Sequence, residues 1–113
     1  MENLRLARQG GVLSLILDQE ITMDVTPDLK REIEAALETP YVAVVLDLSR
    51  VSFMDSSGIG FLASLNARIQ NSGKRLYLLK PSRQVSKTLE LVQLIAYFDV
   101  VDDEAALAER LAR

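Results

Sequence analysis

The fold is decided by one stretch, residues 42–60, which reads VAVVLDLSRVSFMDSSGIG. Its first part, Val42–Leu48, is almost continuously apolar. A strand of that kind is buried on both faces, so it belongs at the centre of a sheet with helices on each side. Its last part holds Asp55 and two serines just before Gly58, and apolar residues then repeat at helical spacing. The stretch therefore predicts a central strand, a connector and a helix that opens at the strand's carboxyl end.

The residues before this stretch predict a hairpin and a helix. Leu4–Arg8 and Val12–Leu17 read as two strands joined by a tight turn at Gly10 and Gly11. A loop over residues 18–25 follows. Thr26 is the expected N-cap of a helix with Pro27 at its first position. The helix has one apolar stripe and stops before Pro40.

The residues after the stretch predict two more strands, each followed by a helix. The strands are Arg75–Leu79 and Tyr97–Val101. One helix opens at Pro81-Ser82, and Asp102 is the expected cap of the last helix. Strands that alternate with helices favour parallel pairing through right-handed crossovers. The sequence thus predicts one α/β domain over residues 1–113, with a small, mixed, mostly parallel β-sheet, an N-terminal hairpin and four helices packed on it. The side chains expected to be largely buried are Val44, Leu46, Leu62, Leu65, Leu78 and Leu89.

The composition excludes several classes of function. The 113 residues include no Cys and no His. Ser-His-Asp and Cys-His catalysis is therefore excluded, as are the usual zinc ligand sets. We expect no catalytic residue, no metal site and no cofactor, and hence not an enzyme.

The charge pattern argues against nucleic acid and membranes as partners. The formal net charge is −3, and anionic partners attract basic surfaces. Between Ser56 and Leu89, however, there are six Lys or Arg residues and no acid. These belong either to ordinary solvated surface, which we favour, or to a face that meets an acidic partner. No segment approaches the ~20 apolar residues of a membrane helix, and the N-terminus does not resemble a signal peptide, so we expect a cytoplasmic protein.

The segment Asp55-Ser56-Ser57 admits two interpretations. Asp and Ser are ordinary N-cap residues, so the segment could simply begin a helix. The glycines that follow match neither a dinucleotide-binding nor a P-loop spacing, and no Ser-x-x-Lys pattern supplies a base. A serine at a helix N-terminus is nonetheless suited to carry phosphate, because free N–H groups and the helix dipole favour an anion there. Such a phosphate would disturb a partner more than the fold.

The stretch from Leu46 to Gly60 resembles the signature of bacterial anti-sigma factor antagonists, in the STAS domain family. The resemblance extends over essentially the whole chain, including the hairpin and the short acidic terminal helix. It implies a STAS fold and a partner-switching role. The unmodified antagonist would bind an anti-sigma factor that is also a serine protein kinase, and so release a sigma factor. The kinase would phosphorylate Ser56 and end the complex, and a serine phosphatase acting on the phosphoserine would reset it.

The resemblance also implies a switch loop and partner-binding surface around Ser56. We expect it to include Thr22, Asp24, Met54, Asp55, Ser57, Gly58, Ile59, Gly60 and Phe61. Many relatives carry an acid where Thr22 stands, which leaves the target open, including one that is not a sigma factor. The alternatives are a STAS interaction subunit of a larger scaffold or lipid-transport complex, and a phospho-aspartate receiver. A receiver has an acidic pair after its first strand, and none follows Val12–Leu17.

Overall fold

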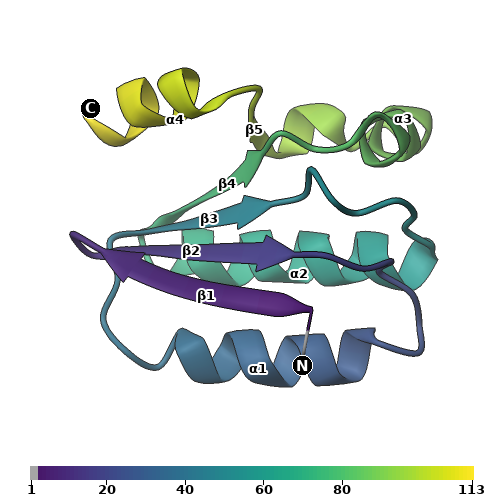
Figure 1. Ribbon diagram of the computed structural model, residues 1–113, viewed down its shortest axis with the longest axis horizontal. Coiled ribbons are helices and arrows are strands. Elements are labelled where there is room, and N and C mark those ends of the chain that lie inside the picture. Colours follow the sequence, from purple (N-terminus) through teal and green to yellow (C-terminus); the bar gives the residue numbers. More distant parts are fainter. Residues whose placement is uncertain (1–2) are drawn as a thin grey trace.

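The helices and strands follow the predicted order. The computed structural model describes residues 3–113. Within that range the chain forms β1 (Leu4–Gln9), β2 (Val12–Leu17), α1 (Thr26–Ala36), β3 (Ala43–Asp47), α2 (Ser56–Asn71), β4 (Arg75–Leu79), α3 (Arg83–Leu91), a short 3-10 helix (Ile95–Tyr97), β5 (Asp99–Val101) and α4 (Glu104–Leu111) (Figure 1).

One sheet has the spatial order β1-β2-β3-β4-β5. β1 pairs antiparallel with β2, and every other pair is parallel. The predicted hairpin and the mostly parallel sheet are therefore confirmed, with β3 at its centre. Gly10 and Gly11 have φ values of 58° and 81°, which an L side chain rarely adopts, so the tight turn depends on this glycine pair.

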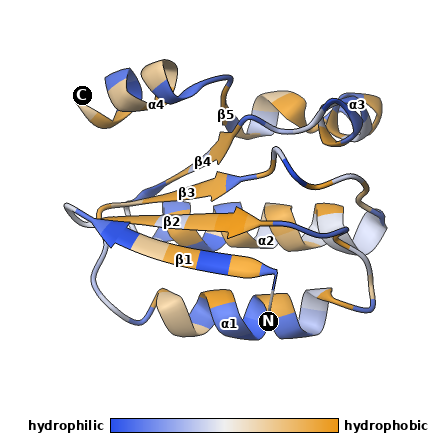
Figure 2. Cartoon of the chain, viewed as in Figure 1, coloured by the Kyte–Doolittle hydropathy of each residue, from blue (hydrophilic) through white to orange (hydrophobic). Residues whose placement is uncertain are grey.

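The two faces of the sheet carry unequal cores. On one face, alternate residues of β2, β3 and β4 pack against α1, α2 and α3 in the larger cluster. On the other face, residues such as Val45 and Tyr77 pack against Leu107 of α4. Apolar colour follows β2, β3 and β4, whereas β1 is mixed (Figure 2). All six side chains that we expected to be buried are buried, with Leu46 and Leu78 fully enclosed.

The central strand is shorter than the apolar run that predicted it. β3 begins at Ala43, and Val42 remains 59% exposed. The Val42 N–H donates to the Gly11 carbonyl oxygen at 2.8 Å, before the parallel ladder begins. Val42 thus belongs to the entry of the strand. β5 likewise begins at Asp99, because Ile95–Tyr97 forms the 3-10 turn that precedes it.

In the first and last helices, α1 and α4, the N-cap position lies one residue away from the residue that we expected to occupy it. Val25 occupies the N-cap position of α1 without a side-chain hydrogen bond, and Thr26 is the first helical residue. The N–H groups of Val25 and Thr26 both donate to the Thr22 carbonyl oxygen, so a turn already leads into the helix. In α4 the cap is Asp103 rather than Asp102, because Asp103 lies three residues before the Ala106 N–H that it accepts from.

Candidate partner-binding site at the start of helix α2

Asp55 holds two separate backbone segments at the start of α2. It is the N-cap, and its Oδ1 accepts from the Gly58 N–H at 3.1 Å. Its Oδ2 accepts from the Met23 N–H at 3.0 Å, which lies in the loop after β2. One carboxylate therefore caps the helix and fixes a loop 32 residues earlier in the chain.

Backbone contacts reinforce this connection. Ile21 and Met54 form a parallel bridge, with the Ile21 N–H donating to Phe53 at 3.0 Å and the Asp55 N–H donating to Ile21 at 3.2 Å. The loop after β2 (residues 18–25) and the connector before α2 (residues 48–55) are thus hydrogen-bonded to each other beyond the carboxyl ends of the strands. We call these two segments the stitched loops. This is the end of an open α/β sheet where working sites commonly lie.

Ser56 is the first residue of α2, and its side chain is exposed. Ser57 follows in the same turn and is partly buried. The first N–H groups of a helix lack partners within the helix and lie at the positive end of its dipole. Ser56 therefore combines access from outside with a local environment that accepts negative charge.

Gly58 is needed at its position because the space around it is filled. A Cβ there would lie within 2.7 Å of the Ile21 carbonyl oxygen and closer still to the Met54 Cγ. Any larger residue would push α2 away from the Ile21–Met54 bridge. The absence of a side chain thus lets the helix start pack directly on the stitched loops.

The structure brings the predicted switch-loop residues together but at different depths. Ser56, Gly60 and Asp24 are exposed, while Thr22, Asp55, Ser57 and Ile59 are partly exposed. Met54, Gly58 and Phe61 are buried. Burial places these last three under the surface, so the others are the ones that can be reached from outside.

The sequence analysis missed two exposed apolar side chains in this region. Met23 is 69% exposed and Phe53 is 43% exposed. Each belongs to one of the two stitched segments, beside Asp55. Met23 lies between Thr22 and Asp24, whereas Phe53 directly precedes the apolar Met54, and neither pattern reveals exposure by itself. Aromatic and Met side chains are enriched where protein interfaces form.

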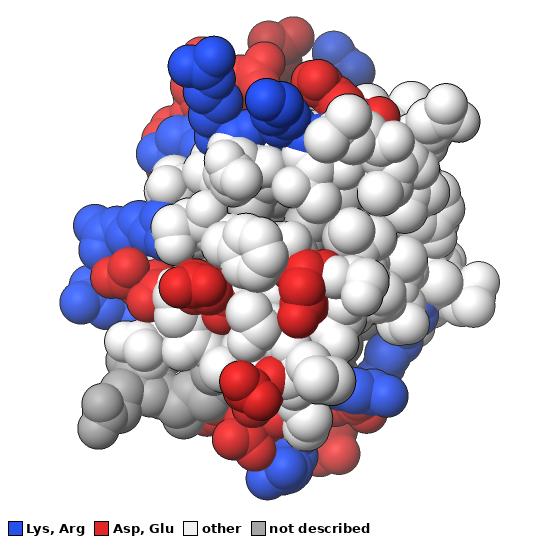
Figure 3. All heavy atoms as spheres, turned by 90° about the vertical axis from the view of Figure 1, so that its right-hand side faces the viewer, with Lys and Arg blue, Asp and Glu red and all other residues white. Residues whose placement is uncertain are grey.

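The face that contains this site carries little positive charge. Uncharged atoms cover most of its middle, acidic groups lie among them, and Lys and Arg lie toward its margin (Figure 3). Three of the six cations between Ser56 and Leu89 pair with acids from elsewhere, since Arg68 contacts Glu34, Arg75 contacts Asp99 and Lys80 contacts Glu104. The predicted run of charge is therefore spread over several elements, and the interpretation as ordinary surface is favoured.

No group of three or more potential ligand side chains for a metal occurs among residues 3–113. Within the same range, no helix is both long and apolar enough to cross a membrane.

Comparison with known proteins identifies the family to which this fold belongs. The STAS domain family matches residues 3–107. A candidate anti-sigma factor antagonist from Thermotoga maritima superposes with a TM-score of 0.90 at 22% identity, covering 97% of this chain and 95% of that one. The unphosphorylated anti-sigma factor antagonist SpoIIAA gives 0.79 at 21% identity, covering 97% of each chain. The phosphorylated form of SpoIIAA from Bacillus gives 0.71 at 21% identity, covering 96% of this chain and 98% of that one. The match over residues 3–107 shows that the chain belongs to the STAS domain family.

Proposed function

We propose that this protein is a phosphorylation-switched anti-sigma factor antagonist. As one cytoplasmic STAS domain over residues 1–113, and without catalytic activity of its own, its unphosphorylated form binds an anti-sigma factor that is also a serine kinase. That binding releases a sigma factor. Phosphorylation of Ser56 ends the complex, and a serine phosphatase restores the binding form.

One observation carries the proposal: Ser56 is exposed at the first position of α2, directly after the residue that caps the helix. A kinase needs access to the hydroxyl group, and Ser56 offers it. Ser57 is only partly exposed, so it is the less accessible of the two serines. The family resemblance of this stretch implies the same serine, and the structurally similar SpoIIAA exists in a phosphorylated form.

The switch follows from desolvation. A partner that packs over the start of α2 strips water from Ser56, which a neutral hydroxyl tolerates. A phosphate adds about −1.5 to −2 charge beside Asp55. An unpaired charge buried in an interface costs several kcal/mol, so the modified surface should release its partner.

The first experiment identifies the modification. The protein is purified from its native cell with its bound partners and analysed by mass spectrometry, and the recovered kinase is then tested with ATP. We expect one phosphate on Ser56, loss of labelling in Ser56→Ala, and normal labelling in Ser57→Ala and in the exposed control Ser52→Ala. Labelling that survives in Ser56→Ala but is lost in Ser57→Ala would show that the assignment of the phosphate to Ser56 is wrong. A stable multi-subunit assembly without phosphate would favour the scaffold role instead.

The second experiment measures binding to that kinase. Phosphorylation of Ser56 should weaken the complex by about tenfold or more, and Ser56→Asp by less, since the carboxylate carries less charge. The matched control is Gln70→Glu, which adds one negative charge to an exposed position near the other end of α2. Equal affinity for all forms would refute the switch.

A further inference from the structure

Large apolar side chains are exposed in one short segment at the end of α3 and in the turn after it. Leu91 is 76% exposed, Val92 45% and Tyr97 42%. Residues 91–98 include no charged residue. This segment leads into β5, at the opposite edge of the sheet from β1 (Figure 1). Clustered exposed apolar side chains mark interaction sites in soluble proteins, and we call these three the α3-end patch.

The turn after α3 is held by a defined set of backbone bonds. The Leu94 N–H donates to the Leu89 carbonyl oxygen at 2.9 Å, and the Gln93 N–H donates to that of Glu90 at 3.0 Å. These two bonds form a Schellman motif, in which the chain leaves a helix through one left-handed residue. Gln93 is that residue, with a φ of 61°. Leu89 is buried, so the motif anchors the end of α3 while the α3-end patch stays at the surface.

Tyr97 is held from two directions. Its ring packs edge to face against the buried Phe98, with 5.0 Å between the ring centroids. Its carbonyl oxygen accepts from the Nδ2 group of Asn66, a buried residue of α2, at 3.4 Å. An aromatic side chain that is fixed in advance loses little conformational entropy when a partner covers it. Tyr97 therefore has the character of a binding anchor.

Two cations extend the α3-end patch along the outer side of α3. Arg83, Lys87 and Leu91 follow one another at intervals of four residues, so they lie in one row on the helix. All three are exposed, whereas Val85 and Leu89 of the same helix are buried. Among residues 3–113, neither Arg83 nor Lys87 has an ion-pair partner. The row thus combines free positive charge with the most exposed apolar residue of the patch.

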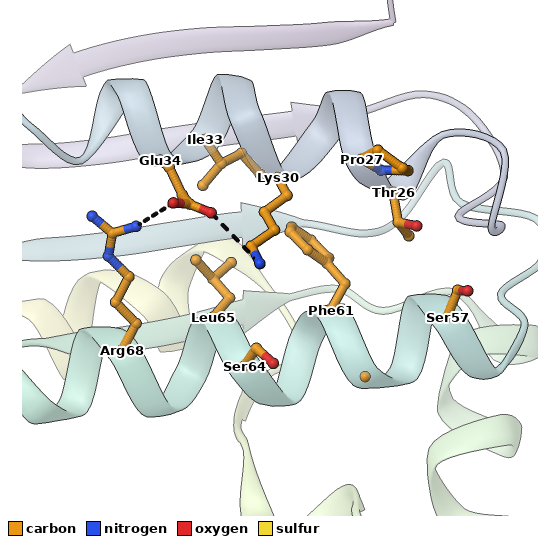
Figure 4. Close-up of a pocket in the computed structure, with 11 residues that line it drawn as sticks. Thr26, Pro27, Lys30, Ile33, Glu34, Ser57, Phe61, Ser64, Leu65 and Arg68 are labelled. Carbon is orange, nitrogen blue, oxygen red and sulfur yellow. Dashed lines mark ion pairs between the residues drawn. The ribbon is translucent and has the colours of Figure 1, made fainter.

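The groove between α1 and α2 provides a contrast. This groove of about 420 Å³ also contains two cations, Lys30 and Arg68, but both pair with Glu34, as the dashed lines in Figure 4 show. Their charge is therefore compensated in part by the protein itself. The charges of Arg83 and Lys87 stay available to a partner, although the basic run to which they belong is otherwise ordinary surface.

We propose that the outer side of α3 and the α3-end patch bind an acidic segment of a partner protein. Carboxylates of the segment meet Arg83 and Lys87, and its apolar side chains pack on Leu91, Val92 and Tyr97. The apolar contacts supply most of the affinity, since exposed ion pairs contribute little. The charges select the partner and steer its approach. This surface is separate from Ser56, and the inference does not depend on the proposed function.

An anionic membrane would meet the same two cations, but the surface favours a protein. Stable attachment to a membrane needs a larger basic cluster or a second anchor, and this row offers two cations. Glu90 is exposed three residues after Lys87, so a flat anionic surface would meet that acid as well. A protein segment can place its acids along Arg83 and Lys87 and leave Glu90 in water.

The test begins with a phage-displayed library of random dodecapeptides, selected on the full chain. We expect the selected peptides to combine Asp or Glu with large apolar residues. In an NMR titration, their consensus peptide should shift amide resonances of α3 and residues 91–98 and leave those of β1 unchanged. A selection without enrichment, peptides without an excess of acids, or shifts centred on the stitched loops would each overturn the proposal.

Matched variants separate the two kinds of contact. Lys87→Gln should weaken the consensus peptide about two- to fivefold, with a smaller difference at high salt. Leu91→Ser should weaken it about five- to twentyfold at any salt concentration. The controls Arg5→Gln and Leu6→Ser make the same changes at exposed positions of β1 and should leave the affinity unchanged. Equal losses in the variants and their controls would contradict recognition by this surface.

Two measurements address other occupants of the surface. Sedimentation with vesicles of phosphatidylserine and phosphatidylcholine in equal parts tests the membrane, and sedimentation velocity of the protein alone tests a second copy. We expect neither vesicle binding nor self-association. Vesicle binding that is lost in Leu91→Ser would assign the surface to a membrane. Self-association that is lost in the same variant would assign it to a second copy, and either result would overturn the proposal.

Discussion

Two helices of this protein begin with the same cap but serve different structural ends. In α2, Asp55 accepts from the N–H three residues later, and in α4, Asp103 does the same for Ala106. The Asp103 cap acts locally, at an exposed helix start. Asp55 uses its second oxygen to hold the loop at Met23. The difference shows that a common capping residue becomes part of a site when tertiary structure gives it a second partner.

The two helices also differ in the residue that stands three positions after the cap. It is Gly58 in α2 and Ala106 in α4. Ala is the better helix former by about 1 kcal/mol, so helix formation alone would favour Ala at both. Packing against Ile21 and Met54 rules it out at Gly58. Helix propensity thus agrees with the residue found in α4, whereas in α2 the close contact with the loop requires glycine in spite of its lower propensity.

The largest effect that we predict is at the caps themselves. Asp55→Ala should lower the free energy of unfolding by about 2–3 kcal/mol, because it removes the cap and the bond to Met23 together. Asp103→Ala should cost only about 1 kcal/mol, the usual value for one cap. Urea denaturation of both variants gives the comparison, and Asp55→Asn, which keeps an acceptor oxygen, should fall between wild type and Asp55→Ala. Equal losses at Asp55 and Asp103 would show that the bond to Met23 adds nothing.

The next effect distinguishes packing from helix propensity. Gly58→Ala should destabilise the protein by about 1–2 kcal/mol, because the cost of overpacking exceeds the gain in propensity. The matched change is Gly60→Ala two residues later, where a Cβ would have nothing within 4 Å. It should stabilise the protein by about 0.5–1 kcal/mol. Thermal unfolding of the two variants should therefore show opposite shifts; a gain in both would mean that Met54 moves aside at little cost.

The sequence predicts what depends on local pattern. The apolar run around Leu46 identifies the central strand, and the pair Gly10-Gly11 identifies the hairpin turn. It also places a helix after Asp55. Which of two adjacent aspartates caps α4 is decided by backbone geometry after β5, which residue preference does not fix.

Contacts between distant segments explain the rest of what was missed. The bridge from Ile21 to Met54 joins residues in different loops, so nothing near either residue reveals it. The bridge and the hydrogen bond from the Met23 N–H to Asp55 bring the segment that contains Met23 to the one that contains Phe53. The groove between α1 and α2 likewise needs both helices in place. The sequence thus indicates where the site begins, whereas its depth and neighbours depend on tertiary packing.

The smallest effect that we predict is that of phosphate on folding. At Ser56 the dipole of α2 favours an added anion by about 0.3–1 kcal/mol. Repulsion from Asp55 opposes this by a similar amount, since exposed charges about 4 Å apart interact by only about 1 kcal/mol in water. The two nearly cancel, so phosphorylation should change the free energy of unfolding by less than about 1 kcal/mol while weakening partner binding by about tenfold or more.

The stitched loops, held by bonds to the Asp55 carboxylate and to backbone groups rather than to the Ser56 hydroxyl, should keep their arrangement. Thermal denaturation and amide spectra of the two forms test this. Changes confined to the first turn of α2 and the loop near Met23 would support a switch that acts through the interface, whereas shifts across β3 and β4 or a fall of many degrees in Tm would require a conformational one.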